Sequence, residues 1–237
     1  MIPKTLFLVS LSTIALPGLS QQNDGTAQSS NIYGDGFNAR VREVPYTPGE
    51  TEGSYFLYNN WSPGTIAMRN GEAVHDVFLK YDVQKNALSI KTDSAYYVLP
   101  VADTKGFTIY DNEQNGFRQF VAARDYQLKE TPLTGALEVL YDNRLSLLSR
   151  TDSKLIEANY SGALSGGSTN DKIVKEKEYF LANHGQLVAL PTKKKEAIAV
   201  LQAYDEAIED FMKKERLKPK READLVQIVE YLNQKKR

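Results

Sequence analysis

Residues 54–190 contain a succession of short strand-like runs separated by turn signals, and this pattern constrains the fold more than any other feature of the chain. No helical period separates the runs, which disfavours parallel β–α–β units. Successive hairpins of this kind build an antiparallel meander, so we predict a β-domain over 54–190 that forms a barrel or a sandwich. The runs lie at 55–58, 65–69, 73–81, 87–91, 95–99, 106–110, 118–122, 136–141, 145–150, 155–160, 176–182 and 186–190.

The dipeptide Asn70-Gly71 is the strongest short hairpin signal, because a type I′ turn needs a positive φ at both central residues. A two-residue loop at this position makes Ile66 face His75 across the hairpin. Strand alternation then defines one apolar face, which we predict to lie in the core, with His75 inside it or at its edge. This face carries Ile66, Met68, Ala73, His75, Val77, Leu79 and Tyr81.

After Pro191 the apolar residues change from strand alternation to helical spacing. Two amphipathic segments follow, and Pro219 separates them because proline ends one helix and can open the next. We therefore predict a C-terminal α-helical hairpin over 191–237, which makes the chain mainly β in an α+β arrangement. The first segment has Ile198, Leu201, Tyr204, Ile208 and Phe211, and the second has Leu225, Ile228, Val229 and Leu232.

The first twenty residues have the three parts of a secretory signal peptide. Lys4 gives a positive start, an apolar stretch follows, and small residues precede a cleavage site between Ser20 and Gln21. The apolar stretch is too short to span a bilayer, which needs about 20 residues. We predict a signal peptide at 1–20, a flexible leader at 21–53, and export to the periplasm or the extracellular space.

The composition excludes several kinds of chemistry. The chain has no cysteine and two histidines, His75 and His184, so it has no disulfide, no thiol nucleophile and no cysteine-based metal site. With 29 Lys+Arg against 30 Asp+Glu, its net charge of -1 gives no general attraction to nucleic acid. We therefore expect no cofactor, no metal, no nucleic-acid partner and no stable membrane insertion.

Two polar segments are typical of turns. Residues 111–116 match the first positions of an EF-hand calcium loop, but Ala122 stands where that loop needs a bidentate glutamate. Strand-like flanks favour a β-hairpin turn there, with weak calcium binding as the alternative. His184 lies between two strand-like runs, which also favours a turn. No motif identifies a catalytic residue, and a pair of glycosidase-type carboxylates stays an alternative because its formation depends on the fold.

The aromatic residues are the best lead to a binding site, since the chain has 14 tyrosines, nine phenylalanines and one tryptophan. Adjacent aromatics on a strand point to opposite faces, so one of Tyr96 and Tyr97 lies off the core unless both faces are covered. Packing inside the β-domain accounts for most of the aromatics. A surface patch that binds a glycan or a protein is the functional alternative, and its candidate ligand-binding residues are Trp61, Tyr96 and Tyr97.

One pattern of structural residues runs Trp61-x-x-Gly64-x-Ile66-x-Met68-x-Asn70-Gly71, followed by Leu79-Lys80-Tyr81-Asp82 and then Leu88. This pattern resembles that of a group of uncharacterised secreted proteins of Bacteroidetes, in which a lysine-rich helical tail ends the chain. The resemblance implies export and a bacterial envelope setting. The family has no assigned activity, so it implies no site residue.

Together these patterns predict an exported, non-enzymatic envelope or secreted protein that binds a protein or glycan partner through its β-domain. One alternative is a hydrolase of envelope sugar or peptide that uses an acid pair. A second alternative is a carrier that holds a small ligand in a barrel cavity.

Overall fold

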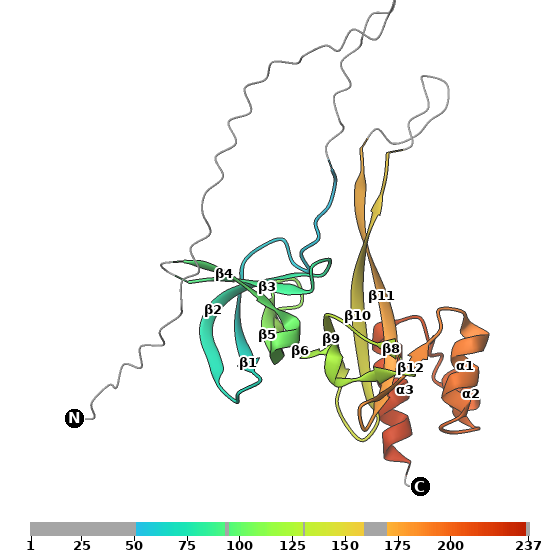
Figure 1. Ribbon diagram of the computed structural model, residues 1–237. Coiled ribbons are helices and arrows are strands. Elements are labelled where there is room, and N and C mark those ends of the chain that lie inside the picture. Colours follow the sequence, from blue (N-terminus) through green and yellow to red (C-terminus); the bar gives the residue numbers. More distant parts are fainter. Residues whose placement is uncertain (1–50, 93–94, 130, 159–169, 236–237) are drawn as a thin grey trace, which may run out of the picture. The chain divides into compact units, whose positions relative to one another are not determined.

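The computed structural model describes residues 51–92, 95–129, 131–158 and 170–235. The predicted signal peptide (1–20), its cleavage site at Ser20 and Gln21, and most of the predicted leader (21–53) lie outside the described residues. In the described residues, all the strands lie between residues 62 and 190, and the α-helices follow them (Figure 1). The strands are β1 Ser62–Met68, β2 Ala73–Asp82, β3 Ala87–Lys91, β4 Tyr96–Pro100, β5 Thr104–Asp111, β6 Gly116–Ala122, β7 Gln127–Leu128, β8 Thr131–Pro132, β9 Ala136–Tyr141, β10 Ser146–Ile156, β11 Lys172–Asn183 and β12 Gln186–Leu190.

These strands form one open sheet in the order β4-β3-β2-β1-β5-β6-β9-β10-β11-β12-β7-β8. Neighbouring strands are antiparallel except β12 and β7, which are parallel. The predicted mainly β class with C-terminal helices is therefore confirmed. The predicted barrel was wrong, because β4 and β8 end the sheet and do not pair with each other. The strands also form one hydrogen-bonded sheet rather than the two sheets of a sandwich.

Sequence periodicity located most strands but not all of their limits. The predicted runs 87–91, 136–141 and 186–190 coincide with β3, β9 and β12. The runs 145–150 and 155–160 were predicted as two strands, yet β10 runs without a break to Ile156. The run 55–58 makes only an isolated bridge between Phe56 and Asp82.

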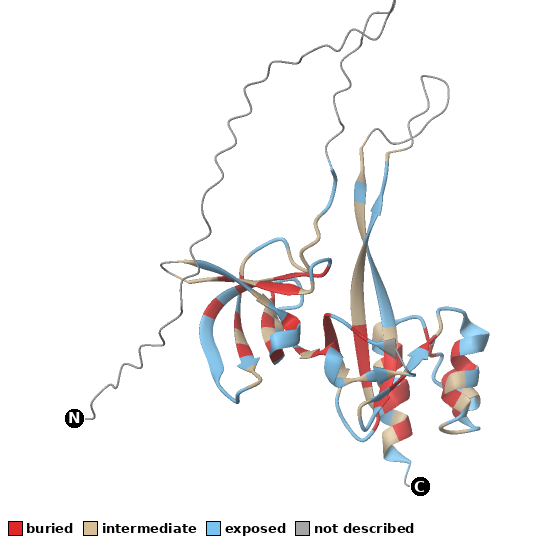
Figure 2. Ribbon diagram, in the orientation of Figure 1, coloured by how far each residue is buried: buried red, intermediate tan, exposed pale blue. Residues whose placement is uncertain are grey.

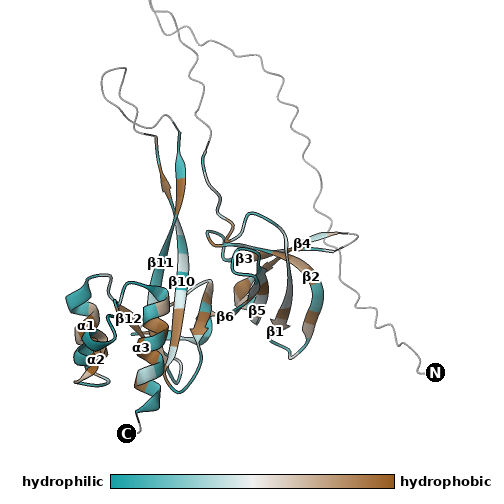
Figure 3. Ribbon diagram, turned by 180° about the vertical axis from the view of Figure 1, so that it is seen from behind, coloured by the Kyte–Doolittle hydropathy of each residue, from teal (hydrophilic) through white to brown (hydrophobic). Residues whose placement is uncertain are grey.

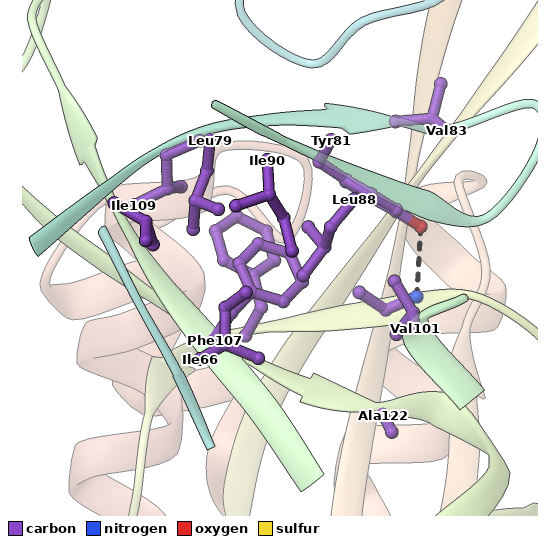
Figure 4. Close-up of a cluster of buried hydrophobic side chains, with 13 residues drawn as sticks. Ile66, Leu79, Tyr81, Val83, Leu88, Ile90, Val101, Phe107, Ile109 and Ala122 are labelled. Atoms are coloured by element: carbon purple, nitrogen blue, oxygen red, sulfur yellow. Dashed lines mark hydrogen bonds between the residues drawn. The ribbon is translucent and has the colours of Figure 1, made fainter. Parts of the chain in front are cut away.

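The first core lies on one face of β1, β2, β3, β5 and β6. Ile66, Leu79, Leu88 and Ile109 are fully buried there. Side chains of β2, β3 and β5 point toward one another across this core (Figure 4). Because alternate residues of a strand share a face, Val77, Leu79 and Tyr81 all point inward, as predicted. The thirteen buried members are Ile66, Val77, Leu79, Tyr81, Val83, Leu88, Ile90, Val101, Phe107, Ile109, Phe120, Ala122 and Ala136.

The β1–β2 hairpin differs from the predicted two-residue turn. The Met68 N–H donates to the Glu72 carbonyl at 2.8 Å, which leaves a three-residue loop with Gly71 at φ 92°. The Glu72 N–H also donates to the Asn70 side-chain oxygen at 3.1 Å. A three-residue loop with glycine in the left-handed region is the next most common hairpin connection after the two-residue turn.

The predicted position of His75 was also wrong. The strand register shifts between Gly64 and Ile66, and Asp76 has φ 56°, so β2 contains a bulge. Ile66 therefore faces Val74 instead of His75. An extra residue in one strand turns the residues before it away from the face that alternation assigns, which leaves His75 exposed.

The C-terminal region has three helices in the described residues, α1 Lys194–Gln202, α2 Ile208–Lys214 and α3 Glu222–Gln234, so the predicted helical hairpin was wrong. The first predicted helix is interrupted at Asp205. Its side-chain oxygen accepts a hydrogen bond from the Ala207 N–H at 3.1 Å, and such local bonds compete with the helical ladder. None of these helices has the length and apolar content needed to cross a membrane.

The second core lies between the helices and the strands β10, β11 and β12. Leu147 and Leu181 from the sheet meet Leu201, Ile208 and Ile228 from the helices, and all five are fully buried. β10 and β11 are buried beside the helices and become exposed farther along (Figure 2). The helices carry both hydrophobic and hydrophilic residues, as expected of amphipathic helices (Figure 3). An open sheet can thus bury this face against helices without closing on itself.

Candidate functional site

The outer face of β2, β3 and β4 brings aromatic and lysine side chains together. Phe78 of β2 lies opposite Lys91 of β3, and Lys91 lies opposite Tyr96 of β4. Their strand neighbours Leu79 and Ile90 point into the first core. Alternation therefore places Phe78, Lys91 and Tyr96 on the opposite, outer face.

Two further aromatic rings join this face. The ring centroids of Trp61 and Tyr96 are 5.8 Å apart at an interplanar angle of 49°. The Lys80 Nζ lies 4.9 Å from the ring centroid of Phe56 and 5.5 Å from that of Trp61, while the Lys91 Nζ lies 6.0 Å from that of Tyr96. We call this group the aromatic–lysine surface, and it consists of Phe56, Trp61, Phe78, Lys80, Lys91 and Tyr96.

The three predicted ligand-binding residues fall into two groups. Trp61 and Tyr96 meet on the aromatic–lysine surface, where Tyr96 is 69% exposed and Trp61 is half-buried. Tyr97 lies opposite Ile90, whose side chain is in the core, so its ring points to the other face at the sheet edge. The structure therefore does not bring Tyr97 to the other two residues.

The lysines of this surface were missed as site residues, although strand alternation gave a signal for them. Alternation already separates Phe78 and Lys80 from the core residues of β2. Neither Lys80 nor Lys91 forms an ion pair with a carboxylate of the described residues. Each instead lies over an aromatic ring, a contact that contributes about 0.5–1 kcal/mol at exposed sites. The surface is thus both apolar and positively charged.

A second constellation joins two acids to two cations between the sheet and α3. Glu138 of β9 is buried and pairs with Arg118, and its other oxygen lies 3.5 Å from the Lys177 Nζ. Glu222, the first residue of α3, lies 2.8 Å from the Lys177 Nζ and 3.4 Å from Arg118. The Tyr179 hydroxyl also donates to Glu222 at 3.3 Å. We call Arg118, Glu138, Lys177 and Glu222 the charge cluster.

Glu222 of the charge cluster does not have the properties of a general acid. A general acid must hold a proton near neutral pH, which requires a raised pKa. Burial alone would raise the pKa of Glu222, but the hydrogen bond and charge of Lys177 and the charge of Arg118 lower this pKa below its ordinary value. Both acids share the same two cations, so these ion pairs connect the start of α3 to the sheet.

The segment 111–116 forms the turn between β5 and β6, as predicted. One Asp111 oxygen accepts hydrogen bonds from the N–H groups of Glu113 and Gln114, at 2.8 and 3.2 Å. The other oxygen accepts from the Tyr58 hydroxyl at 3.2 Å, inside a polar pocket of about 300 Å³ that Lys175 also lines. Within the described chain, no group of three His, Asp or Glu residues is placed to hold a metal ion.

His184 is also in the predicted turn, between β11 and β12, and it has φ 48°. A groove with a volume of about 530 Å³ lies along β11 and β12. Lys177, Tyr179, Leu190 and Pro219 are among its lining residues. It borders the charge cluster through Lys177, whose ammonium is already paired with Glu222.

The carrier alternative required a closed barrel with an internal cavity. The sheet is open, and the inner face of its first strands is covered by the packed side chains of the first core. The geometry therefore favours a surface site over an internal one. Comparisons of the chain with protein-family models, curated proteins and solved structures found no match, so the resemblance to secreted Bacteroidetes proteins stays a prediction.

Proposed function

We propose that this chain is an exported, non-enzymatic envelope or secreted protein that binds a protein or glycan partner on the aromatic–lysine surface. One observation carries the proposal: Trp61 and Tyr96, far apart in the sequence, lie with their rings 5.8 Å apart on an exposed sheet face. The signal-peptide pattern of residues 1–20 supports export.

The chemistry of the surface suits a binding role. Aromatic rings provide a large apolar area with few rotatable bonds, and they stack on sugar rings as well as on protein side chains. Removing the exposed rings of Tyr96 and Phe78 from water lowers the free energy of the complex. Lys80 and Lys91 add positive charge to the same surface, and this charge can set the orientation and the specificity of a bound partner.

The protein offers a direct reporter for this test, because Trp61 is its only tryptophan. We would titrate the full chain with a panel of neutral and anionic oligosaccharides and with extended peptides, and follow the emission of Trp61. A true ligand should change the emission, and its affinity should fall in the Tyr96→Ala and Lys91→Gln variants.

Phe117→Ala is the matched control, since Phe117 is another exposed aromatic, 64% accessible, that lies on β6 outside the aromatic–lysine surface. Equal losses in Tyr96→Ala and Phe117→Ala would contradict the proposal. So would a hydrolase activity of the chain that disappears in a Glu138→Gln variant, because that result would move the function to the charge cluster.

A further inference from the structure

β4 is an edge strand with one open side. It pairs with β3 and ends the sheet, so a second row of backbone groups has no strand partner in the described sheet. Such an edge is a template for another extended chain.

The hydrogen bonds at both ends of the β3–β4 pair show which residues face the open side. The Val101 N–H donates to the Asn86 carbonyl at 3.0 Å, and the Thr92 N–H donates to the Ala95 carbonyl at 3.0 Å. Hydrogen-bonded pairs alternate along an antiparallel ladder, so Tyr97 and Leu99 also direct their backbone groups toward β3. The N–H and C=O groups of the residues between them, Tyr96 and Val98, therefore point to the open side.

Before Pro100, this edge lacks the usual protection of edge strands. Natural edges carry charged residues, prolines or bulges that prevent further pairing. β4 has no charged residue, and its three consecutive apolar side chains Tyr96, Tyr97 and Val98 are 69%, 43% and 72% exposed. Only Pro100, at the end of the strand, lacks an N–H group. The open side and the aromatic–lysine surface meet at Tyr96.

We propose that β4 accepts an extended, acidic strand of a protein partner, which extends the sheet beyond its edge. The inference rests on the proposed function and chooses a protein over a glycan. Main-chain hydrogen bonds to Tyr96 and Val98 give the affinity in this mode of recognition, and side chains of alternate residues give the specificity.

The charges favour an acidic partner over a second copy of this chain. Lys91 lies on the outer face, one strand inside the edge, and its ammonium lies over the ring of Tyr96. A second copy that paired its own β4 with this edge would bring the uncharged side chains of that strand beside Tyr96, and none of them supplies a carboxylate for Lys91. A partner strand with carboxylates on that face would instead attract Lys91.

The alternation of β4 also fixes the pattern of the partner. Side chains next to Tyr96 and Val98 lie on the outer face, near the lysines, and should be acidic. Those next to Tyr97 and Leu99 lie on the other face, beside the end of the first core, and should be apolar. A strand that alternates acidic and apolar residues meets both conditions.

A labelled peptide tests this pattern with the full chain. The probe is a peptide of about ten residues that alternates glutamate with valine, and its counterpart alternates lysine with valine. We expect the glutamate peptide to bind, to change the emission of Trp61, and to slow amide hydrogen exchange at Tyr96 and Val98. The lysine peptide should bind at least about tenfold more weakly.

A proline at Val98 removes one N–H that points to the open side, so no hydrogen bond to β3 is lost. Edge strands tolerate proline at such positions. Val98→Pro should lower the affinity for the glutamate peptide by about tenfold, which corresponds to the loss of one backbone hydrogen bond and the change in local geometry. Val98→Thr keeps the N–H, and its affinity for the glutamate peptide should stay within about twofold of that of the unmodified chain. The exchange measurement on the unmodified chain needs no variant, so a misfolded Val98→Pro protein leaves the test intact.

Three outcomes would overturn the inference. In the first, the glutamate peptide does not bind, or binds without protection of the Tyr96 and Val98 amides. In the second, an anionic polysaccharide such as polygalacturonate changes Trp61 emission equally in Val98→Pro and in the unmodified chain. This result would keep the proposed binding function but exclude a partner strand at β4. In the third, the chain dimerises in a way that Val98→Pro abolishes, which would assign the edge to a second copy.

Discussion

The hydroxyl oxygen of Tyr81 lies 3.0 Å from the backbone nitrogen of Ala136 and accepts its hydrogen bond (Figure 4). Tyr81 is on β2 and Ala136 begins β9, and three strands separate β2 from β9 in the sheet order. The Tyr81 ring also contacts the ring of Phe107, with centroids 5.5 Å apart. One side chain thus connects two strands that do not pair, which helps the sheet to curve around its first core without closing.

Tyr81→Phe should destabilise the protein by about 1–2 kcal/mol, because it leaves the buried N–H of Ala136 without its acceptor. Urea unfolding followed by circular dichroism measures this loss. Tyr96→Phe is the control, since the exposed Tyr96 should change stability by less than about 0.5 kcal/mol. Equal stability of the two variants would contradict the role of the Tyr81 hydroxyl.

The charge cluster should make stability depend on acidic pH through Glu222. Its pKa is lower in the folded protein than the ordinary value of 4.5, so the folded state binds fewer protons than the unfolded state. The stabilisation is therefore complete above pH 4.5 and is lost as the pH falls through the lower folded pKa. Glu222→Gln should flatten this part of the profile.

The free energy of unfolding, measured in urea between pH 3 and pH 7, checks this prediction. Glu230→Gln provides a matched control on the same helix, because Glu230 is exposed and forms no ion pair with a described residue. An acid profile that changes as much in Glu230→Gln as in Glu222→Gln would show that the cluster is not the cause.

Gly64 on β1 should not tolerate a side chain. A Cβ at this position would overlap the Thr108 carbonyl oxygen and a methyl carbon of Leu79, both of which are fixed by neighbouring strands. Gly64→Ala should cost about 2 kcal/mol of stability. Gly116→Ala is the control, since the atom nearest to its new Cβ would be 3.9 Å away. In thermal unfolding, its midpoint should lie close to that of the unmodified protein, whereas the midpoint of Gly64→Ala should be lower.

The contact between Trp61 and Tyr96 can be tested without a ligand. Tyr96→Ala should expose the Trp61 ring to water and shift its emission to longer wavelength, while stability changes by less than about 0.5 kcal/mol. Fluorescence spectra of the folded variants measure the shift. Phe117→Ala should leave the spectrum unchanged, because its ring contacts Tyr110 instead. An unshifted spectrum in Tyr96→Ala would contradict the contact.

Local patterns were enough to predict the strand-rich class, the inward face of Val77, Leu79 and Tyr81, and the helix that became α3. Alternation and helical spacing are properties of consecutive residues, so neither depends on distant parts of the chain. The bulge at Asp76 and the helix break at Asp205 were missed. Both arise from backbone conformations and side-chain hydrogen bonds that weak local preferences do not specify.

The aromatic–lysine surface shows where the two kinds of information divide. The sequence by itself determined that Tyr96 and Tyr97 point to opposite faces, because adjacent strand residues always do. Only the tertiary structure decided which of them would meet Trp61. That choice depends on the register of β2 with β3 and of β3 with β4, and on whether the sheet closes or ends at β4. Register and closure are set by packing between distant strands, and a single strand's sequence does not encode them.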